Sequence, residues 1–294
     1  MSSGLLLIDK PSGWTSHDVV AKLRGALGTR RVGHAGTLDP MATGLLLIGV
    51  NSATKLLTFL VGEDKTYLAT IRLGASTITD DKESDFLYVS EPEKVSAVAD
   101  AEIEKAIASL RGEIQQVPSS VSAIKVNGER AYAKVRAGDE VKLSARPVTI
   151  SKFQILGKPE RIQEAGRQFI DIEVEVDCSS GTYIRALARD LGAALGVGGH
   201  LVALKRTRIG KYALDQAQPM ELPEQENFNV LDISAAAAQQ FSVRVLSDQE
   251  VIDLHHGKRL KAAEGDSVVF AGVDSTGKLV AMLTATKNEV KSLV

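Results

Sequence analysis

Two segments of this chain place apolar residues at every second position, and this period constrains the fold more than any other feature. Residues 66–73 carry Tyr67 on such a stripe, and residues 169–178 alternate apolar with mostly acidic side chains. A period of two is typical of β-strands with one buried face. We therefore expect both segments to be strands, with Tyr67 facing inward.

Shorter patterns predict the elements near the N-terminus. The apolar runs 5–8 and 44–50 are suited to buried strands. Between them, Thr15 or Ser16 can cap a helix whose apolar residues recur on one side, and Gly28 is positioned to end it. The sequence thus predicts a strand, a helix and a second strand.

Arg185 is expected in the first turn of another helix, directly after the strand 169–178. That position is close to a strand end, where open sheets tend to place their sites, so Arg185 is a candidate site residue. Residues 100–111 also have helical spacing. The acidic stretch that precedes them is expected to be a solvated, mobile loop. The Asn127–Gly128 pair predicts a hairpin turn.

A domain boundary is expected near residue 240. The stretch 219–225 is rich in proline and glutamate, and the alanine run 235–238 indicates weaker core signals. Beyond it, residues 242–246 suit a strand, 248–255 a short helix and 267–285 a hairpin. We expect one domain over residues 1–240 and a small β-rich module over residues 241–294.

Composition excludes several classes of protein. The single cysteine, Cys178, rules out an intramolecular disulfide framework and a cysteine-rich zinc site, and it fits a reducing compartment. The N-terminus predicts a strand and not a signal peptide, and no apolar run reaches membrane-spanning length. A net charge of −2 argues against indiscriminate nucleic-acid binding. A basic cluster at residues 205–211 still permits a local basic face. We expect a cytoplasmic protein.

The segment 30–40 concentrates groups that can carry chemistry. It contains two arginines, two glycines, His34 and Asp39, and Pro40 restricts the backbone just after the carboxylate. Taken alone, Asp39 is more simply a turn residue, and His34 a loop residue. By the same standard Tyr67 is a core aromatic and Arg185 a structural partner of a carboxylate.

The order of several motifs favours a functional interpretation. The run Gly-His-Ala-Gly-Thr-Leu-Asp-Pro at 33–40 resembles the bacterial TruB family of tRNA pseudouridine synthases, which modify position 55 in the TΨC loop. Further similar motifs lie at residues 9–16, 42–46, 65–67, 179–185 and 204–210. The resemblance covers nearly all of residues 4–215. So many ordered motifs would rarely coincide by chance.

The resemblance implies an α+β fold. The family has a mixed, mainly antiparallel bent sheet with flanking helices and a central RNA-binding cleft, followed by a small PUA-like module. Residues 118–147 would correspond to an RNA-clamping loop. In this chain Ser119 and Val121 stand where the family often has a proline and a tyrosine.

The resemblance also implies roles for single residues. Asp39 would be the catalytic carboxylate, with Arg185 as its partner. Tyr67 would stack on the flipped uracil, Leu204 would pack beside it, and His34 would fill the space that the base vacates. The residues expected to contact RNA are Lys10, Arg30, Arg31, Lys125, Arg130, Lys205, Arg206 and Arg208. We expect no cofactor and no metal, tRNA as the partner, no membrane association, no obligatory protein partner, and a monomer.

Two other classes of function stay open from the sequence. An RNA-binding or tRNA-folding protein without essential catalysis would use the same basic residues. A carboxylate-dependent hydrolase of a sugar bond would need a second acid in the site. None of the motif segments supplies an obvious one.

Overall fold

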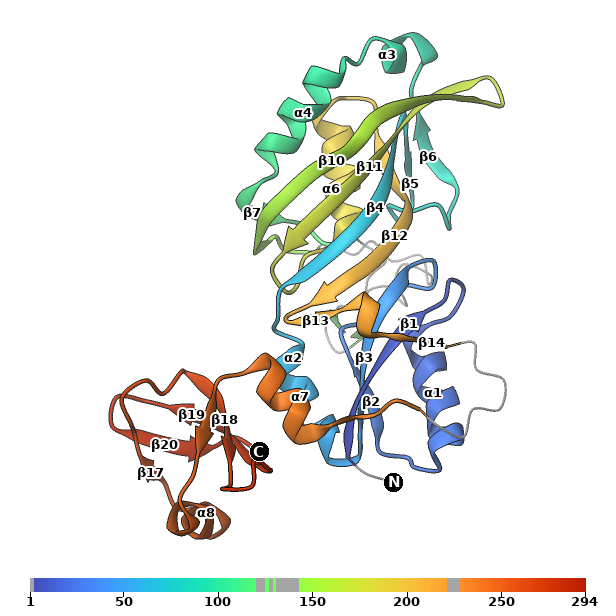
Figure 1. The fold of residues 1–294 in the computed structure, drawn as a ribbon. Helices are drawn as coiled ribbons and strands as arrows, with labels where there is room; N and C mark the ends of the chain where they lie inside the picture. Colours follow the sequence, from blue (N-terminus) through green and yellow to red (C-terminus); the bar gives the residue numbers. More distant parts are fainter. Residues whose placement is uncertain (1–2, 120–124, 127–128, 131–142, 221–227) are drawn as a thin grey trace. The chain divides into compact units, whose positions relative to one another are not determined.

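The chain forms two compact units. The computed structural model describes residues 3–119, 125–126, 129–130, 143–220 and 228–294. Unit 1 is built from Met1–Pro40, Gly44–Val61 and Ile209–Val294, and unit 2 from Met41–Thr43 and Gly62–Arg208. Strands of both units belong to mainly antiparallel sheets with helices beside them (Figure 1). The α+β class expected from the sequence is confirmed.

In unit 1 the central strands are β1 (Gly4–Lys10) and β3 (Thr43–Val50), which pair antiparallel. Strand β2 (Val32–Ala35) pairs with the other edge of β3. Helix α1 (Ser16–Leu27) begins at a Thr15 cap and ends at Gly28, whose φ of 62° is left-handed and suits glycine. The predicted strand, helix and strand are all present.

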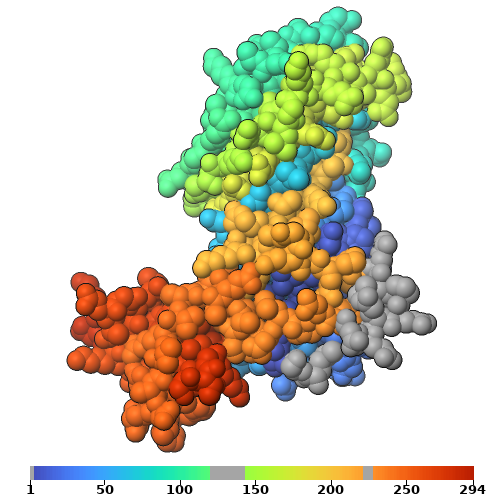
Figure 2. Space-filling model, viewed as in Figure 1, coloured from blue at the N-terminus to red at the C-terminus, as the bar shows by residue number. Residues whose placement is uncertain are grey.

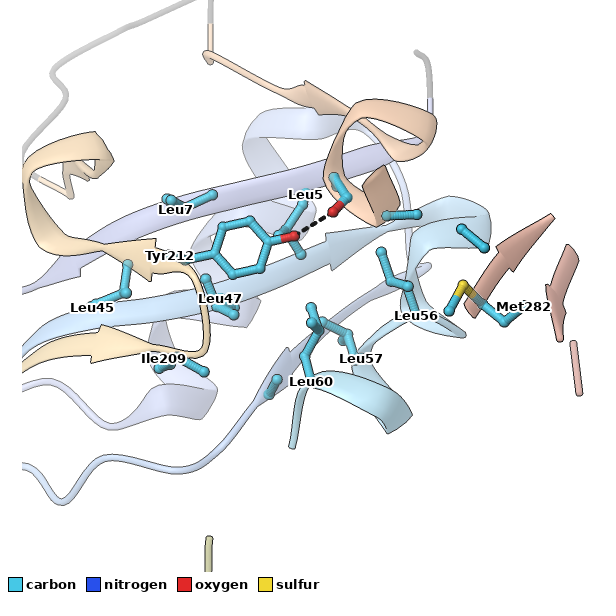
Figure 3. Packing of buried hydrophobic residues seen from close by; sticks show 14 residues of the cluster. Leu5, Leu7, Leu45, Leu47, Leu56, Leu57, Leu60, Ile209, Tyr212 and Met282 are labelled. Atoms are coloured by element: carbon cyan, nitrogen blue, oxygen red, sulfur yellow. Dashed lines mark hydrogen bonds between the residues drawn. The ribbon is translucent and has the colours of Figure 1, made fainter. Parts of the chain in front are cut away.

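A leucine-rich core lies on one side of β1 and β3 (Figure 3). The Tyr212 hydroxyl enters it and donates a hydrogen bond to the carbonyl of Ala236 at 2.6 Å. Ala236 belongs to α7 (Ile233–Gln240), and with Ala237 it is part of this core, although the alanine run 235–238 indicated weaker core signals. Small side chains bring the α7 backbone close to the sheet, a tertiary effect that composition does not reveal.

The C-terminal residues of unit 1 form a separate five-stranded sheet of order β16-β18-β19-β20-β17. Helix α8 (Asp248–His255) has the predicted bounds, and β18 (Val269–Val273) and β19 (Leu279–Ala285) form the predicted hairpin. Met282 of β19 packs into the cluster that contains Leu56 and Ala237. The other strands are β16 (Val243–Val245), β17 (Leu260–Lys261) and β20 (Glu289–Ser292).

Unit 2 contains the strand order β12-β4-β11-β10-β7. The two strands with the period of two are β4 (Lys65–Leu73) and β11 (Arg167–Cys178), and they pair antiparallel with Tyr67 opposite Val176. The others are β12 (Gly199–Ile209), β10 (Arg146–Glu164) and β7 (Gly112–Gln116). Helix α4 (Asp100–Ser109) and the β10–β11 ribbon lie side by side on the surface (Figure 2).

The acidic stretch before α4 is ordered, contrary to expectation. It contains β6 (Phe86–Val89), which pairs with the preceding β5 (Ala75–Thr77), and α3 (Pro92–Ser96). Two of its carboxylates, Asp80 and Asp81, are buried. Arginines elsewhere in unit 2 neutralise them, which is why an acidic run does not imply a solvated loop here.

Some shorter elements complete the description. Strands β8 (Lys125–Val126) and β9 (Glu129–Arg130) pair on either side of the predicted Asn127–Gly128 turn. The turn itself, most of the proposed clamping loop and residues 221–227 lie outside the described residues. The remaining elements are η1 (Asn51–Thr54), α2 (Leu57–Leu60), α6 (Ile184–Ala194), β13 (Tyr212–Ala213), η2 (Leu214–Gln216), β14 (Gln218–Pro219) and β15 (Leu231–Asp232).

Candidate active site

In unit 1, Asp39 follows a residue whose backbone is fixed at both of its polar groups. The Ser16 hydroxyl accepts a hydrogen bond from the Leu38 amide at 2.9 Å and donates one to the Leu38 carbonyl at 3.3 Å. Ser16 is fully buried, and the Leu38 side chain is buried as well. Pro40, on the other side, accepts a hydrogen bond from the Gly13 amide at 2.8 Å. The half-buried Asp39 is therefore held between two anchored neighbours.

Lys10 also fixes this loop. Its side chain is fully buried, and Nζ donates to the carbonyls of Pro11 at 2.9 Å, Trp14 at 2.6 Å and Pro40 at 3.3 Å. Three carbonyl dipoles compensate the loss of hydration that burial of an ammonium causes. The expected RNA contact of Lys10 stays a prediction, and the burial of its ammonium among these carbonyls argues against it.

His34 lies on β2, where it is opposite Ile48 of β3. Its ring meets the ring of His17 with centroids 5.5 Å apart and an angle of 78° between the planes, an edge-to-face arrangement. His17 is the second residue of α1, next to Ser16. The sequence did not single out His17, since the contact joins a helix and a strand that are separated along the chain.

Tyr67 and Leu204 are both buried in unit 2. Tyr67 belongs to the inward-facing stripe of β4, as its alternating pattern predicted. Leu204 lies on β12, the strand adjacent to β4 in the sheet order. The two residues therefore belong to neighbouring strands.

Arg185 is bound by a turn in the acidic stretch of unit 2. Its Nη1 donates to the Thr79 carbonyl at 2.9 Å and lies 3.3 Å from Oδ2 of Asp81. Both side chains of the ion pair are buried, with exposed fractions of 8% and 4%. Asp81 lies outside the motif segments. The expected pairing of Arg185 with Asp39, which belong to different units, stays a prediction.

Neighbouring contacts fix the same turn and the start of α6. Arg189, one turn beyond Arg185, pairs with Asp80 at 3.2 Å. Burial raises the pKa of Asp80 above its ordinary value, and Arg189 partly offsets this. The buried Gln116 accepts from the Tyr183 amide at 2.8 Å and donates to the Tyr183 carbonyl at 3.1 Å. The backbone just before Arg185 is thus anchored to β7.

A buried cationic pair lies on β4 and β12. Lys65 is buried, and desolvation together with the charge of Arg206 lowers its pKa to about 8. Arg206 is itself 1% exposed. The expected phosphate contact of Arg206 stays a prediction, and the burial of its side chain argues against it. A guanidinium is the cation that tolerates such burial best.

Three family models match this chain in succession. Residues 24–184 match the N-terminal domain of TruB family pseudouridylate synthases. Residues 185–232 match the tRNA pseudouridylate synthase B C-terminal domain, and residues 241–294 match the C-terminal part of tRNA pseudouridine synthase II. The chain belongs to the TruB family of pseudouridylate synthases. It is therefore a member of a family of isomerases.

Curated relatives from the same family resemble the chain over most of its length. A tRNA pseudouridine synthase B of Arthrobacter sp. (strain FB24) is 58% identical over 90% of this chain and 84% of its own length. Another, of Leifsonia xyli, is 54% identical over 100% and 96%. Among solved structures, the crystal structure of a Cbf5-Nop10-Gar1 complex aligns with a TM-score of 0.71 over 99% of this chain and 83% of that one, at 23% identity. That likeness concerns the fold alone.

The basic residues of this TruB family member fall into different environments. Arg30, Arg31 and Lys205 are exposed. Arg208 is half-buried; its Nε donates to the Thr66 hydroxyl at 2.8 Å and its Nη2 lies 3.6 Å from Asp177. The side chains of Lys125 and Arg130 are outside the described part of the chain. RNA contacts by all of these residues stay predictions.

In the described residues, no cluster of three or more His, Cys, Asp or Glu side chains is arranged to hold a metal ion. Nor does any helix in the described ranges have the length and apolar character needed to cross a membrane.

Proposed function

We propose that the protein converts uridine 55 in the TΨC loop of tRNA into pseudouridine, with Asp39 as the catalytic carboxylate. The observation that carries this proposal is the anchored segment 33–40, in which Ser16 and Lys10 hold the backbone on both sides of Asp39. Relatives named tRNA pseudouridine synthase B, at up to 58% identity, support tRNA as the substrate.

The reaction is an isomerisation. The bond between C1′ of the ribose and N1 of uracil breaks, the base turns, and C1′ bonds to C5, which gives up its proton while N1 gains one. A carboxylate beside the sugar assists departure of the base. The active site must retain the free uracil and exclude water. A rigid backbone on both sides of Asp39 suits this role, because a positioned carboxylate reorganises little during the reaction.

The roles that we propose for the other residues follow from the resemblance to the TruB family. Tyr67 stacks on the uracil and exchanges a proton with the sugar, and Leu204 packs beside the base. Arg185 keeps Asp39 ionised, and Asp81 holds the guanidinium in position. His34 enters the space from which the uridine is extruded, which offsets the unstacking cost of a few kcal/mol.

Around this centre, exposed basic residues bind the RNA backbone. Arg30, Arg31 and Lys205 contact phosphates, which orient the tRNA without reading its sequence. The segment 118–147, with Lys125 and Arg130, closes on the RNA. We place the catalytic domain in residues 1–240 and a PUA-like module in residues 241–294. We further propose a monomer that acts in the cytoplasm, where bacterial tRNA is modified.

The test is to incubate the purified protein with an unmodified tRNA transcript and to map pseudouridine at single-base resolution. Wild type should modify uridine 55. Asp39→Asn should give no product while it binds tRNA with nearly unchanged affinity, because the substitution removes only the charge. Tight binding without product by wild type would favour an RNA-binding or RNA-folding protein and would overturn the proposal.

A further inference from the structure

The first turn of α1 is unusually well fixed for a helix end. Thr15 and Asp18 form a capping box: the Thr15 amide donates to Oδ2 of Asp18 at 2.8 Å, and the Asp18 amide donates to the Thr15 hydroxyl at 3.1 Å. Ser16, the next residue, binds both backbone groups of Leu38. His17 therefore projects from a turn that is tied to the segment carrying Asp39.

His34 is also carried by a rigid element. Strand β2 pairs with β3 over four residues, from Val32 opposite Val50 to Ala35 opposite Leu47. A histidine on a strand keeps one rotatable bond between its ring and Cβ, and that torsion is broad. The pairing with β3 fixes the backbone of His34 and does not by itself set the orientation of the ring.

The contact with His17 constrains the orientation of the ring. The two imidazoles meet edge to face at 5.5 Å between centroids, the geometry that aromatic pairs prefer. His17 is exposed and His34 half-buried, so the pair lies at the protein surface beside the anchored loop. A ring set in advance loses less freedom when it is inserted into RNA.

We propose that His17 is a positioning residue that sets the ring of His34 for entry into the space left by the extruded uridine. The proposal rests on the proposed function, because it concerns a step of base extrusion. His17 acts through His34 and needs no contact of its own with the reacting atoms.

The experiment compares two replacements of similar size. His17→Leu removes the ring, and His17→Phe keeps it. We expect His17→Leu to lower kcat/KM on a tRNA transcript about two- to tenfold, which is the range for loss of one aromatic pair. His17→Phe should stay within about twofold of wild type. His256→Leu, which replaces an exposed histidine in the C-terminal module, is the matched control and should be fully active.

A double-mutant cycle separates a positioning role from direct RNA binding. In a His34→Ala background, His17→Leu should cause no further loss, because the ring that it positions is gone. An equal loss in both backgrounds would mean that His17 contacts the RNA itself and would overturn the proposal. Equal impairment by His17→Phe and His17→Leu, or no impairment by His17→Leu, would overturn it as well.

An NMR measurement, which needs no turnover, tests this inference independently of the proposed function. The chain has five histidines, whose ring nitrogens can be followed by NMR. His17→Leu should shift the ring signals of His34 and leave those of His200 and His255 in place; unchanged His34 signals would refute the contact. If wild type made no pseudouridine, the proposed function would fail, and the NMR comparison would still decide whether His17 sets the His34 ring.

Discussion

Arg185 of α6 and Asp81 of the turn after β5 form an ion pair of 3.3 Å, although 104 positions separate them in the chain. Asp81 also accepts a hydrogen bond from the Glu83 amide at 3.0 Å. Because the carboxylate is fixed by its own turn and the guanidinium also binds the Thr79 carbonyl, the two groups constrain each other. The position of a candidate catalytic arginine thus depends on a carboxylate from outside the recognised motifs.

Replacing Asp81 should reduce both stability and turnover. Asp81→Ala leaves the buried Arg185 without its carboxylate, and breaking a buried pair in this way costs about 3–5 kcal/mol. Asp81→Asn keeps the shape of the side chain and should lower the free energy of unfolding by less. We expect a loss of turnover in both variants that exceeds the loss of tRNA affinity. Pseudouridine yield, filter binding and urea unfolding measure the three quantities, with the exposed Asp85→Asn as the control. Normal turnover by Asp81→Asn would show that Arg185 does not need the charge of Asp81.

Ser16→Ala tests the anchor of the catalytic loop. The substitution leaves the Leu38 amide and carbonyl without the hydroxyl that binds both, at a cost of about 1–3 kcal/mol for buried unsatisfied groups. Because the anchor is next to Asp39, kcat should fall by more than ten times while tRNA affinity changes little. Ser109→Ala, at an exposed helix position, is the matched control. A stability loss with an unchanged kcat would restrict Ser16 to a structural role.

Lys10 and Lys205 should behave in opposite ways. Lys10→Met removes the donor to three carbonyls and should lower the free energy of unfolding by several kcal/mol. Lys205→Met, at an exposed position, should leave stability unchanged. It should instead weaken tRNA binding and reduce the slope of log affinity against log salt by about 1. A salt slope unchanged by Lys205→Met would remove Lys205 from the RNA contacts.

The buried Lys65 should make stability depend on pH in the alkaline range. Its pKa is about 8 in the folded protein and returns to 10.5 on unfolding. Between these values the unfolded chain binds more protons than the folded one, so stability rises with pH. Relative to Lys65→Met, wild type should gain about 2 kcal/mol between pH 7.5 and 9.5. Chemical unfolding of both proteins at the two pH values measures the difference.

The comparison with Lys65→Met also removes a contribution of opposite sign. Burial raises the pKa of the Cys178 thiol to about 11 from an ordinary 9.0. The contribution of Cys178 to the free energy of unfolding therefore falls as the pH rises from 9 to 11. Cys178 is present in both proteins, so the effect of its burial cancels in the difference. The charge of Lys65 lowers the pKa of the thiol, and Lys65→Met removes that part in the variant. A difference that does not change with pH would mean that Lys65 keeps an ordinary pKa in the folded state.

The sequence by itself determined the elements whose cause is local. The period of two in β4 and β11 follows from the geometry of a single strand, and the bounds of α8 follow from its cap at Ser247 and the glycine at 257. The motif at 33–40 likewise identified the family, because a run of eight residues is compared directly along the chain. None of these inferences required knowledge of contacts between residues that are distant in the sequence.

Tertiary structure decided the environment of the charged residues. Lys10 and Arg206 look like phosphate-binding residues in the sequence, yet both are buried; Asp81 belongs to a run that looks solvated, yet it holds Arg185. The contact between His17 and His34 likewise joins two elements that share no local pattern. A charge is stable in either setting, since water solvates it at the surface and dipoles or an opposite charge compensate it inside. Which of the two applies depends on partners that only folding brings near.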